Sequence, residues 1–149
     1  MRVSLRSTYG IMAAVDLALH AGTSPVQAKA IARRQGIPSR FLEQVLHAMK
    51  HAGVISSLRG AQGGYVLTRH PSELSLADIF EALETPRFTR LGANGHSSLA
   101  KKTKSQLLLD KVWERVHEAE RQVLERITIE ELAAELRMIE QKSTLMYHI

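Results

Sequence analysis

A glycine-rich basic loop lies between two short apolar runs in the first half of this chain, and few folds accommodate such a loop. It reads Arg-Gly-Ala-Gln-Gly-Gly-Tyr over residues 59–65, between the runs at 54–58 and 66–68. Glycine tolerates the positive φ angles of tight turns, and a turn flanked by two β-prone runs is typical of a hairpin. We therefore expect an antiparallel hairpin with Arg59 at its tip.

Two short helical patterns precede the hairpin, and a Gly-Ile-Pro turn at residues 36–38 separates them. The first covers about residues 27–35, with Arg33 and Arg34 facing outward, and a glycine suits the position after its C-terminus. The second covers about residues 38–51, because the fixed φ of proline suits a first helical turn. A helix, a tight turn, a second helix and a hairpin form the order of a winged helix-turn-helix. This order predicts DNA binding.

The second of these helices is expected to read bases. Its apolar stripe consists of Phe41, Leu42, Val45, Leu46 and Met49, and its polar face consists of Arg40, Glu43, Gln44 and His47. Arg40 matches the acceptors of guanine and Gln44 those of adenine, while Glu43 either accepts from cytosine or orients Arg40. A polar helix face is more often plain solvated surface, and only its place between the turn and the hairpin favours a DNA-reading role.

The wing and the nearby cations complete the expected DNA contact. Arg59 suits insertion into a narrow minor groove. The wing glycines let the backbone approach DNA and supply N–H donors to phosphate. The other residues expected at the DNA are Gly60, Gln62, Gly63, Gly64 and Tyr65 in the wing, and Arg2, Arg6, Lys29 and Lys50 toward phosphates.

The rest of the chain is predominantly helical. A first helix over about residues 4–20 is apolar nearly all round, so it must be covered on two sides. Ser75 and Asp78 resemble a capping box that opens a further short helix. We divide the chain into a winged helix-turn-helix domain (1–84), a loop (85–103), two helices (104–138) and a disordered tail (139–149). The fold class is mainly α with a small β-hairpin.

The long helix over about residues 104–126 carries an apolar seam. Its members are Leu109, Val112, Val116, Ala119 and Val123, stepping by three and four residues, and Trp113 broadens it. At about 1.5 Å per residue the helix is ~33 Å long, more than the first domain covers. The seam packs either against its own domain or against a partner helix, and its length favours a homodimer.

Charge is divided unevenly along the chain. Residues 1–70 hold nine Lys and Arg against two acids, whereas residues 71–149 hold eleven against thirteen. Basic charge gathered on the winged domain is typical of a phosphate-facing surface, although plain solubilising charge is the alternative. The chain has no cysteine, no apolar run long enough to span a membrane and no secretory leader, so we expect a cytoplasmic protein without disulfides.

Other classes of protein are less consistent with the sequence. His47 and His51 have the spacing of two metal ligands on one helix, but a third ligand is missing; His96 is expected to be exposed. The sequence contains no nucleophile elbow, phosphate loop, zinc-protease motif or dinucleotide fingerprint, so we do not expect an enzyme. The alternative function is a regulatory module with the same fold that acts mainly through a partner protein.

Several segments together resemble the Rrf-two family of winged-helix transcription regulators. The resemblance covers about residues 1–135 and implies a homodimer built on a long swapped helix, a repressor-type regulator and an imperfect palindromic DNA site. It also implies DNA contacts at Arg40, Glu43, Gln44 and Arg59. The matching segments are Tyr9, Asp16-Leu17-Ala18-Leu19, Ile31-Ala32, Arg34-Gln35-Gly36-Ile37, Phe41-Leu42-Glu43-Gln44-Val45-Leu46, Arg59-Gly60, Gly63-Gly64-Tyr65, Leu76, Asp78-Ile79, Trp113 and Ile127-Thr128-Ile129-Glu130-Glu131-Leu132.

One departure from the family pattern concerns its cofactor. Members that bind an iron–sulfur cluster place three cysteines in the sensor loop before the long helix, but this loop has none and carries Ala93 and Ala100 in that region. A three-thiolate cluster site is therefore absent. The chain resembles the cluster-free branch, which leaves a partner protein, a small effector or oxidation chemistry elsewhere as the signal.

Overall fold

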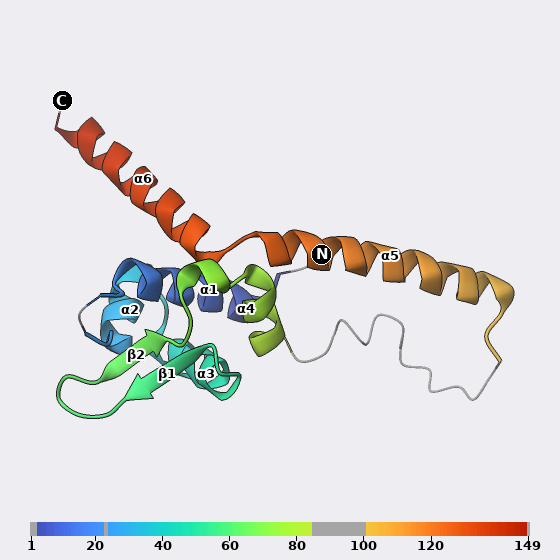
Figure 1. The fold of residues 1–149 in the computed structure, drawn as a ribbon, viewed down its shortest axis with the longest axis horizontal. Coiled ribbons are helices and arrows are strands. Elements are labelled where there is room, and N and C mark those ends of the chain that lie inside the picture. The colour runs from blue at the N-terminus through green and yellow to red at the C-terminus, as the bar shows by residue number, and fades with distance from the viewer. Residues whose placement is uncertain (1–2, 23, 85–100, 149) are drawn as a thin grey trace.

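The computed structural model describes residues 3–22, 24–84 and 101–148 (Figure 1). Most of this part of the chain is helical, and its two strands form one antiparallel sheet. The order of elements confirms the expected mainly helical fold with a hairpin wing. The elements are α1 (Leu5–Leu19), α2 (Ala28–Gln35), α3 (Ser39–His51), β1 (Ile55–Leu58), β2 (Gly64–Leu67), the short 3-10 helix η1 (Pro71–Glu73), α4 (Leu76–Leu83), α5 (Lys104–Arg126) and α6 (Ile129–Tyr147).

Helix α1 forms the centre of the packed body. It contacts α2, α3, α4 and the start of α6, so its nearly all-round apolar surface is covered on more than one side, as expected. Four of the five residues of the α3 stripe are fully buried. The exception is Phe41, which is 37% exposed and packs edge-to-face on Tyr9 with ring centroids 5.4 Å apart. Its position at the start of α3, on the rim of the core, explains the difference.

The junction between α5 and α6 is joined to the winged domain by backbone hydrogen bonds. The Leu76 N–H donates to the Ile127 carbonyl at 2.9 Å, and the Ile129 N–H donates to the Leu74 carbonyl at 2.8 Å. The capping box at Ser75 is also present, since the Ser75 N–H donates to Asp78 Oδ2 at 2.9 Å. This anchored junction holds the base of α6 against α1.

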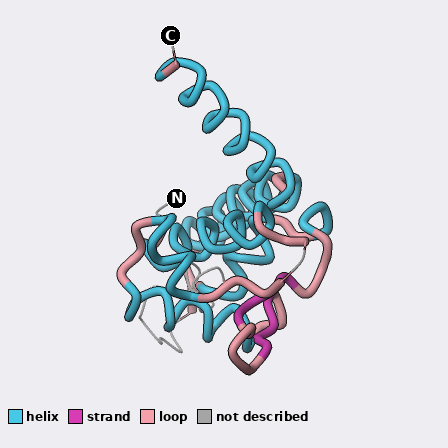
Figure 2. Tube along the Cα trace, turned by 90° about the vertical axis from the view of Figure 1, so that its left-hand side faces the viewer, coloured by secondary structure: helices cyan, strands magenta, loops and turns pink. Residues whose placement is uncertain are grey.

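The two C-terminal helices lie largely outside the body. Helix α5 extends away from it along its N-terminal half, and α6 rises at an angle from the junction (Figures 1 and 2). The last helix was expected to end near residue 138, before a disordered tail; instead it continues to Tyr147. Residues 129–147 contain neither glycine nor proline and are rich in good helix formers, which explains the longer helix.

Some sequence predictions fall outside the described residues. These are the structure of residues 85–100 in the predicted loop, with Ala93, His96 and Ala100, and the DNA contact assigned to Arg2. Within the described ranges, no helix has both the length and the apolar character needed to cross a membrane.

Candidate nucleic-acid interface

Helix α3 presents a polar face to solvent. Leu42, Val45, Leu46 and Met49 anchor the opposite face in the core. The exposed residues of the polar face are Arg40, Glu43, Gln44, His47 and Lys50. Because helical spacing places the two sets on opposite sides, the buried stripe fixes the direction in which the polar side chains project. The structure therefore brings together all the α3 residues predicted to contact DNA.

The turn before α3 is sharply defined. Gly36 adopts a left-handed conformation with φ 64° and ψ 31°, which ends α2 and which glycine adopts without strain. Ile37 is buried, and its N–H donates to the Ala32 carbonyl at 3.1 Å. The chain thus changes direction over three residues, with the side chain of Ile37 fixed in the core.

An ion pair between a buried carboxylate and a partly exposed guanidinium holds the end of α2 against α1. Asp16 is fully buried and accepts hydrogen bonds from Arg34 Nε at 3.0 Å, Arg34 Nη2 at 2.7 Å and Gln35 Nε2 at 2.9 Å. We refer to these three residues as the Asp16 clamp. Arg34 is exposed, as expected of an outward-facing residue, but its guanidinium turns back to bind this carboxylate. The sequence feature that could have predicted this ion pair is Asp16 itself, a single acidic residue within the largely apolar helix α1.

The contacts of the Asp16 clamp also set its protonation. Burial raises the pKa of Asp16, but the hydrogen bonds from Arg34 and Gln35, with the positive charges of Arg34 and His20, outweigh burial and hold this pKa below its usual value. The hydrogen bond to Asp16 likewise raises the pKa of Arg34. The pair is therefore ionised at neutral pH.

This lowered pKa predicts an acid-sensitive contribution to stability. A carboxyl whose pKa is lower in the folded state stabilises the fold above its unfolded pKa of about 3.9, and the contribution is lost as the pH falls through the folded value. We expect wild-type protein to lose unfolding free energy more steeply than Asp16→Asn as the pH falls below about 5. Urea denaturation at a series of pH values measures this, and parallel profiles would contradict it.

The wing is fixed to Val26, which lies just before the N-cap of α2. The Val26 N–H donates to the Tyr65 carbonyl at 3.0 Å, and the Tyr65 N–H donates back to the Val26 carbonyl at 2.8 Å. This bridge adds a third strand position to the hairpin, whose register pairs Ile55 with Leu67 and Leu58 with Gly64. No pattern in the sequence predicts this bridge, because only one residue on each side makes it.

The wing glycines have different roles in the structure. Gly63 is buried and its N–H donates to the Gly60 carbonyl at 2.9 Å, so this N–H shapes the turn rather than remaining available to a phosphate. Gly64 has φ 153°, and a Cβ there would lie 2.5 Å from the Val26 carbonyl oxygen. At the tip, Arg59, Gly60 and Gln62 are exposed, whereas Tyr65 is half-buried.

Substitution of Gly64 tests this close approach. We expect Gly64→Ala to lower the unfolding free energy by about 1–3 kcal/mol, because the added methyl group meets backbone that has no room to retreat. Gly60→Ala is the matched control: Gly60 also has a positive φ, 114°, but a Cβ there meets nothing within 4 Å. Urea denaturation of both variants makes the comparison, and equal losses would show that only backbone strain matters.

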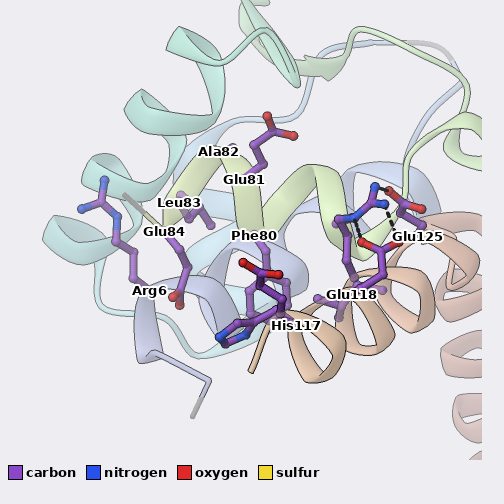
Figure 3. Close-up of a pocket in the computed structure, with 13 residues that line it drawn as sticks. Arg6, Phe80, Glu81, Ala82, Leu83, Glu84, His117, Glu118 and Glu125 are labelled. Carbon is purple, nitrogen blue, oxygen red and sulfur yellow. Dashed lines mark hydrogen bonds and ion pairs between the residues drawn. The ribbon is translucent and has the colours of Figure 1, made fainter. Parts of the chain in front are cut away.

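Arg6 lies apart from the predicted DNA-reading elements. It lines a groove of about 1060 Å³ between α1, α4 and α5, with Phe80, Glu84 and His117 (Figure 3). Across the groove, Arg121 pairs with Glu118 and Glu125, and its hydrogen bond lowers the pKa of Glu118. By contrast, Lys29 is exposed on α2, within the helix-turn-helix. The structure thus places Lys29, and not Arg6, with the helix-turn-helix.

The α5 seam is exposed along its length. The exposed fractions are 52% for Leu109, 40% for Val112, 49% for Trp113, 40% for Val116 and 57% for Val123, and Ala119 is exposed as well. Leu124 is the only buried residue of α5. The described part of the chain therefore leaves this seam largely uncovered, which disfavours intramolecular packing, one of the two alternatives above.

The histidine pair on α3 has no third ligand in the described ranges. His47 and His51 are both exposed. A search of the same residues finds no group of three His, Asp or Glu side chains arranged to hold a metal ion.

Comparison with known proteins gives one consistent result. The sequence model of the Rrf2 (Rrf-two) family, described as an iron-dependent transcriptional regulator, matches residues 3–135. The chain is 31% identical over 134 residues to the transcriptional regulator CymR of Bacillus subtilis, covering 90% of this chain and 91% of that protein. The solved structure of B. subtilis CymR, the global cysteine regulator, is similar with a TM-score of 0.72 and 30% identity, covering 91% and 98% of the two chains. T. potens IscR is similar with a TM-score of 0.74 and 35% identity, covering 91% and 88%.

Proposed function

Because this chain belongs to the Rrf2 family of DNA-binding transcriptional regulators, we propose that it is a repressor that binds an imperfect palindrome as a homodimer. The observation that carries the proposal is the exposed polar face of α3 beside a wing tipped by Arg59. Both belong to the half of the chain that holds nine Lys and Arg against two acids. A basic surface that carries a helix suited to the major groove and a hairpin suited to the flanking DNA is suited to bind duplex DNA.

The residues divide by the chemistry that they offer to DNA. Arg40 and Gln44 have donors suited to base edges in the major groove, and Arg59 suits a narrow minor groove. Lys29 and Lys50 are exposed cations suited to phosphates, whose contacts make binding depend on salt. Gly63 and Gly64 shape the wing that carries Arg59. Bound at a promoter, such a protein excludes polymerase sterically.

The homodimer is supported by the exposed α5 seam. Its large apolar side chains remain 40–57% exposed in the single chain, and a second copy of the same helix offers the same 3–4 spacing. A two-fold dimer presents two recognition helices to two half-sites, so the symmetry of the DNA site follows that of the protein. Regulation of this kind takes place where the chromosome lies, and we assign the protein to the cytoplasm.

The iron cofactor implied by the family description does not fit these residues as a cysteine-ligated cluster. The chain has no cysteine, so thiolate ligands are unavailable. The described residues also lack a cluster of three other metal-binding side chains. We infer that a signal reaches this regulator without such a cluster, through a partner protein or a small effector.

Selection of bound duplexes from random DNA, at near-physiological salt, tests the proposed function. We expect a palindromic consensus, with half-site centres about one helical turn apart or a multiple of it. Uniform, salt-sensitive binding without a consensus would contradict sequence-specific recognition. A pull-down that retains a protein partner after nuclease treatment would then favour the alternative, an interaction module with the same fold.

A further inference from the structure

We propose that Asp16 is a positioning residue for DNA recognition, which acts through Arg34 and Gln35 to fix the angle at which α2 presents α3 and the wing. The inference rests on the proposed function of sequence-specific DNA binding. Asp16 itself is fully buried within α1, so it does not contact DNA. Its effect on recognition must therefore pass through the Asp16 clamp.

Helix α2 packs on the core through one large apolar side chain and several small ones. It has eight residues, Ile31 is its only fully buried side chain, and the side chain of its N-cap Gln27 makes no capping hydrogen bond. Its other apolar contacts with the core come from the partly buried Ala28, Ala30 and Ala32, and side chains this small constrain rotation about the helix axis only weakly. Arg34 donates two hydrogen bonds to the Asp16 carboxylate, one to each oxygen. This bidentate contact is planar and directional, and so restrains orientation in a way that apolar packing does not.

Both ends of α2 lead to DNA-reading elements. At its C-terminus, Arg34 and Gln35 are followed at once by Gly36 and the turn into α3. At its N-terminus, Val26 is joined to Tyr65 of the wing by two backbone hydrogen bonds. A displacement of α2 is therefore passed to the turn that leads into the recognition helix and to the wing, and the Asp16 carboxylate restrains α2 between the two.

Stability alone does not account for a buried charge at this place. Apolar residues of similar volume often replace buried ion pairs without loss of stability, because removing two charges from water offsets their attraction. What apolar residues do not supply is a defined orientation of the two partners. The Asp16 clamp supplies that orientation at the helix end that leads into the turn.

The test compares Asp16→Asn, which keeps the shape of the side chain and removes its charge, with a core control remote from α2. Ile129→Val, at a fully buried position of α6, is that control. The readout is the ratio of affinities for the selected DNA site and for a scrambled duplex, at one salt concentration and at a temperature where both variants are folded. We expect Asp16→Asn to lower this ratio about tenfold or more, as for loss of one base contact, and Ile129→Val to preserve it. A folded Asp16→Asn with the wild-type ratio would overturn the proposal.

A double-mutant cycle and hydrogen exchange separate positioning from general destabilisation. Arg34→Gln alters a side chain that is 37% exposed, so it supplies the comparison should Asp16→Asn fail to fold. Because the two residues act through one contact, the double variant should lose no more specificity than either single variant; additive losses would overturn the proposal. We also expect faster exchange at the Ile37 N–H in either single variant. Unchanged exchange at the Ile37 N–H would overturn the role of the Asp16 clamp. A wild-type protein that shows no sequence preference would instead overturn the proposed function. In that case the exchange result alone decides whether the Asp16 clamp holds the turn.

Discussion

Val116→Glu separates the proposed dimer into monomers. Val116 lies at the centre of the seam, with Leu109 and Val123 seven residues away on either side, so an antiparallel pair of α5 helices brings two copies of residue 116 together at the two-fold axis. Two carboxylates buried there without partners cost about 3–5 kcal/mol, which weakens association by a factor of about 10² or more. Sedimentation equilibrium measures the change.

The monomer itself should remain folded in this variant. Val116 is 40% exposed in the single chain and lies outside the core that α1, α3 and α4 share. Lys111→Glu is the control, because it introduces the same side chain on α5 outside the seam spacing, and it should remain dimeric. A Val116→Glu protein that sediments as the wild type does would show that the seam is not the dimer interface.

Arg59→Ala should produce the second large effect, a loss of DNA affinity. Removing an arginine that contacts a groove costs about 1–3 kcal/mol, and a dimer uses two wings, so the loss per dimer approaches twice that value. Fluorescence anisotropy with a labelled operator at fixed salt measures it. The fold should be unaffected, since Arg59 is exposed at the wing tip.

Arg33→Ala separates a specific contact from loss of charge. Arg33 is an exposed cation on α2 that carries no assigned contact, so this variant removes one charge from the same basic domain. We expect its affinity to change far less than that of Arg59→Ala. An unchanged dissociation constant for Arg59→Ala would remove Arg59 from the interface.

Features set by local sequence were predicted well. The wing follows from glycines between apolar runs, the capping box from Ser75 and Asp78, and the long helix from its 3–4 spacing. In each case the residues that determine the structure lie within a few positions of one another. The polar face of α3 was predictable for the same reason, because one helical period defines both of its faces.

Features that join distant segments were missed. The Asp16–Arg34 pair links residues 18 positions apart, and the Val26–Tyr65 bridge links residues farther apart still. Neither leaves a periodic pattern, so a buried acid resembles a surface one and an ion-paired arginine resembles a solvated one. The extent of α6 was missed for another reason: an exposed helix is set by helix propensity more than by an apolar pattern.

Helix α5 is held firmly at one end only, so a small rotation at that end moves its other end by a large distance. Its C-terminal end is held to the winged domain by the Leu76–Ile127 and Leu74–Ile129 hydrogen bonds, while its other end lies beyond the body. Over a length of about 33 Å, a tilt of about 10° at the anchored end displaces the far end by roughly 6 Å. That displacement is nearly two base-pair steps of about 3.4 Å, so in the proposed dimer a small change of angle at this junction would change the spacing of the half-sites that the two winged domains reach.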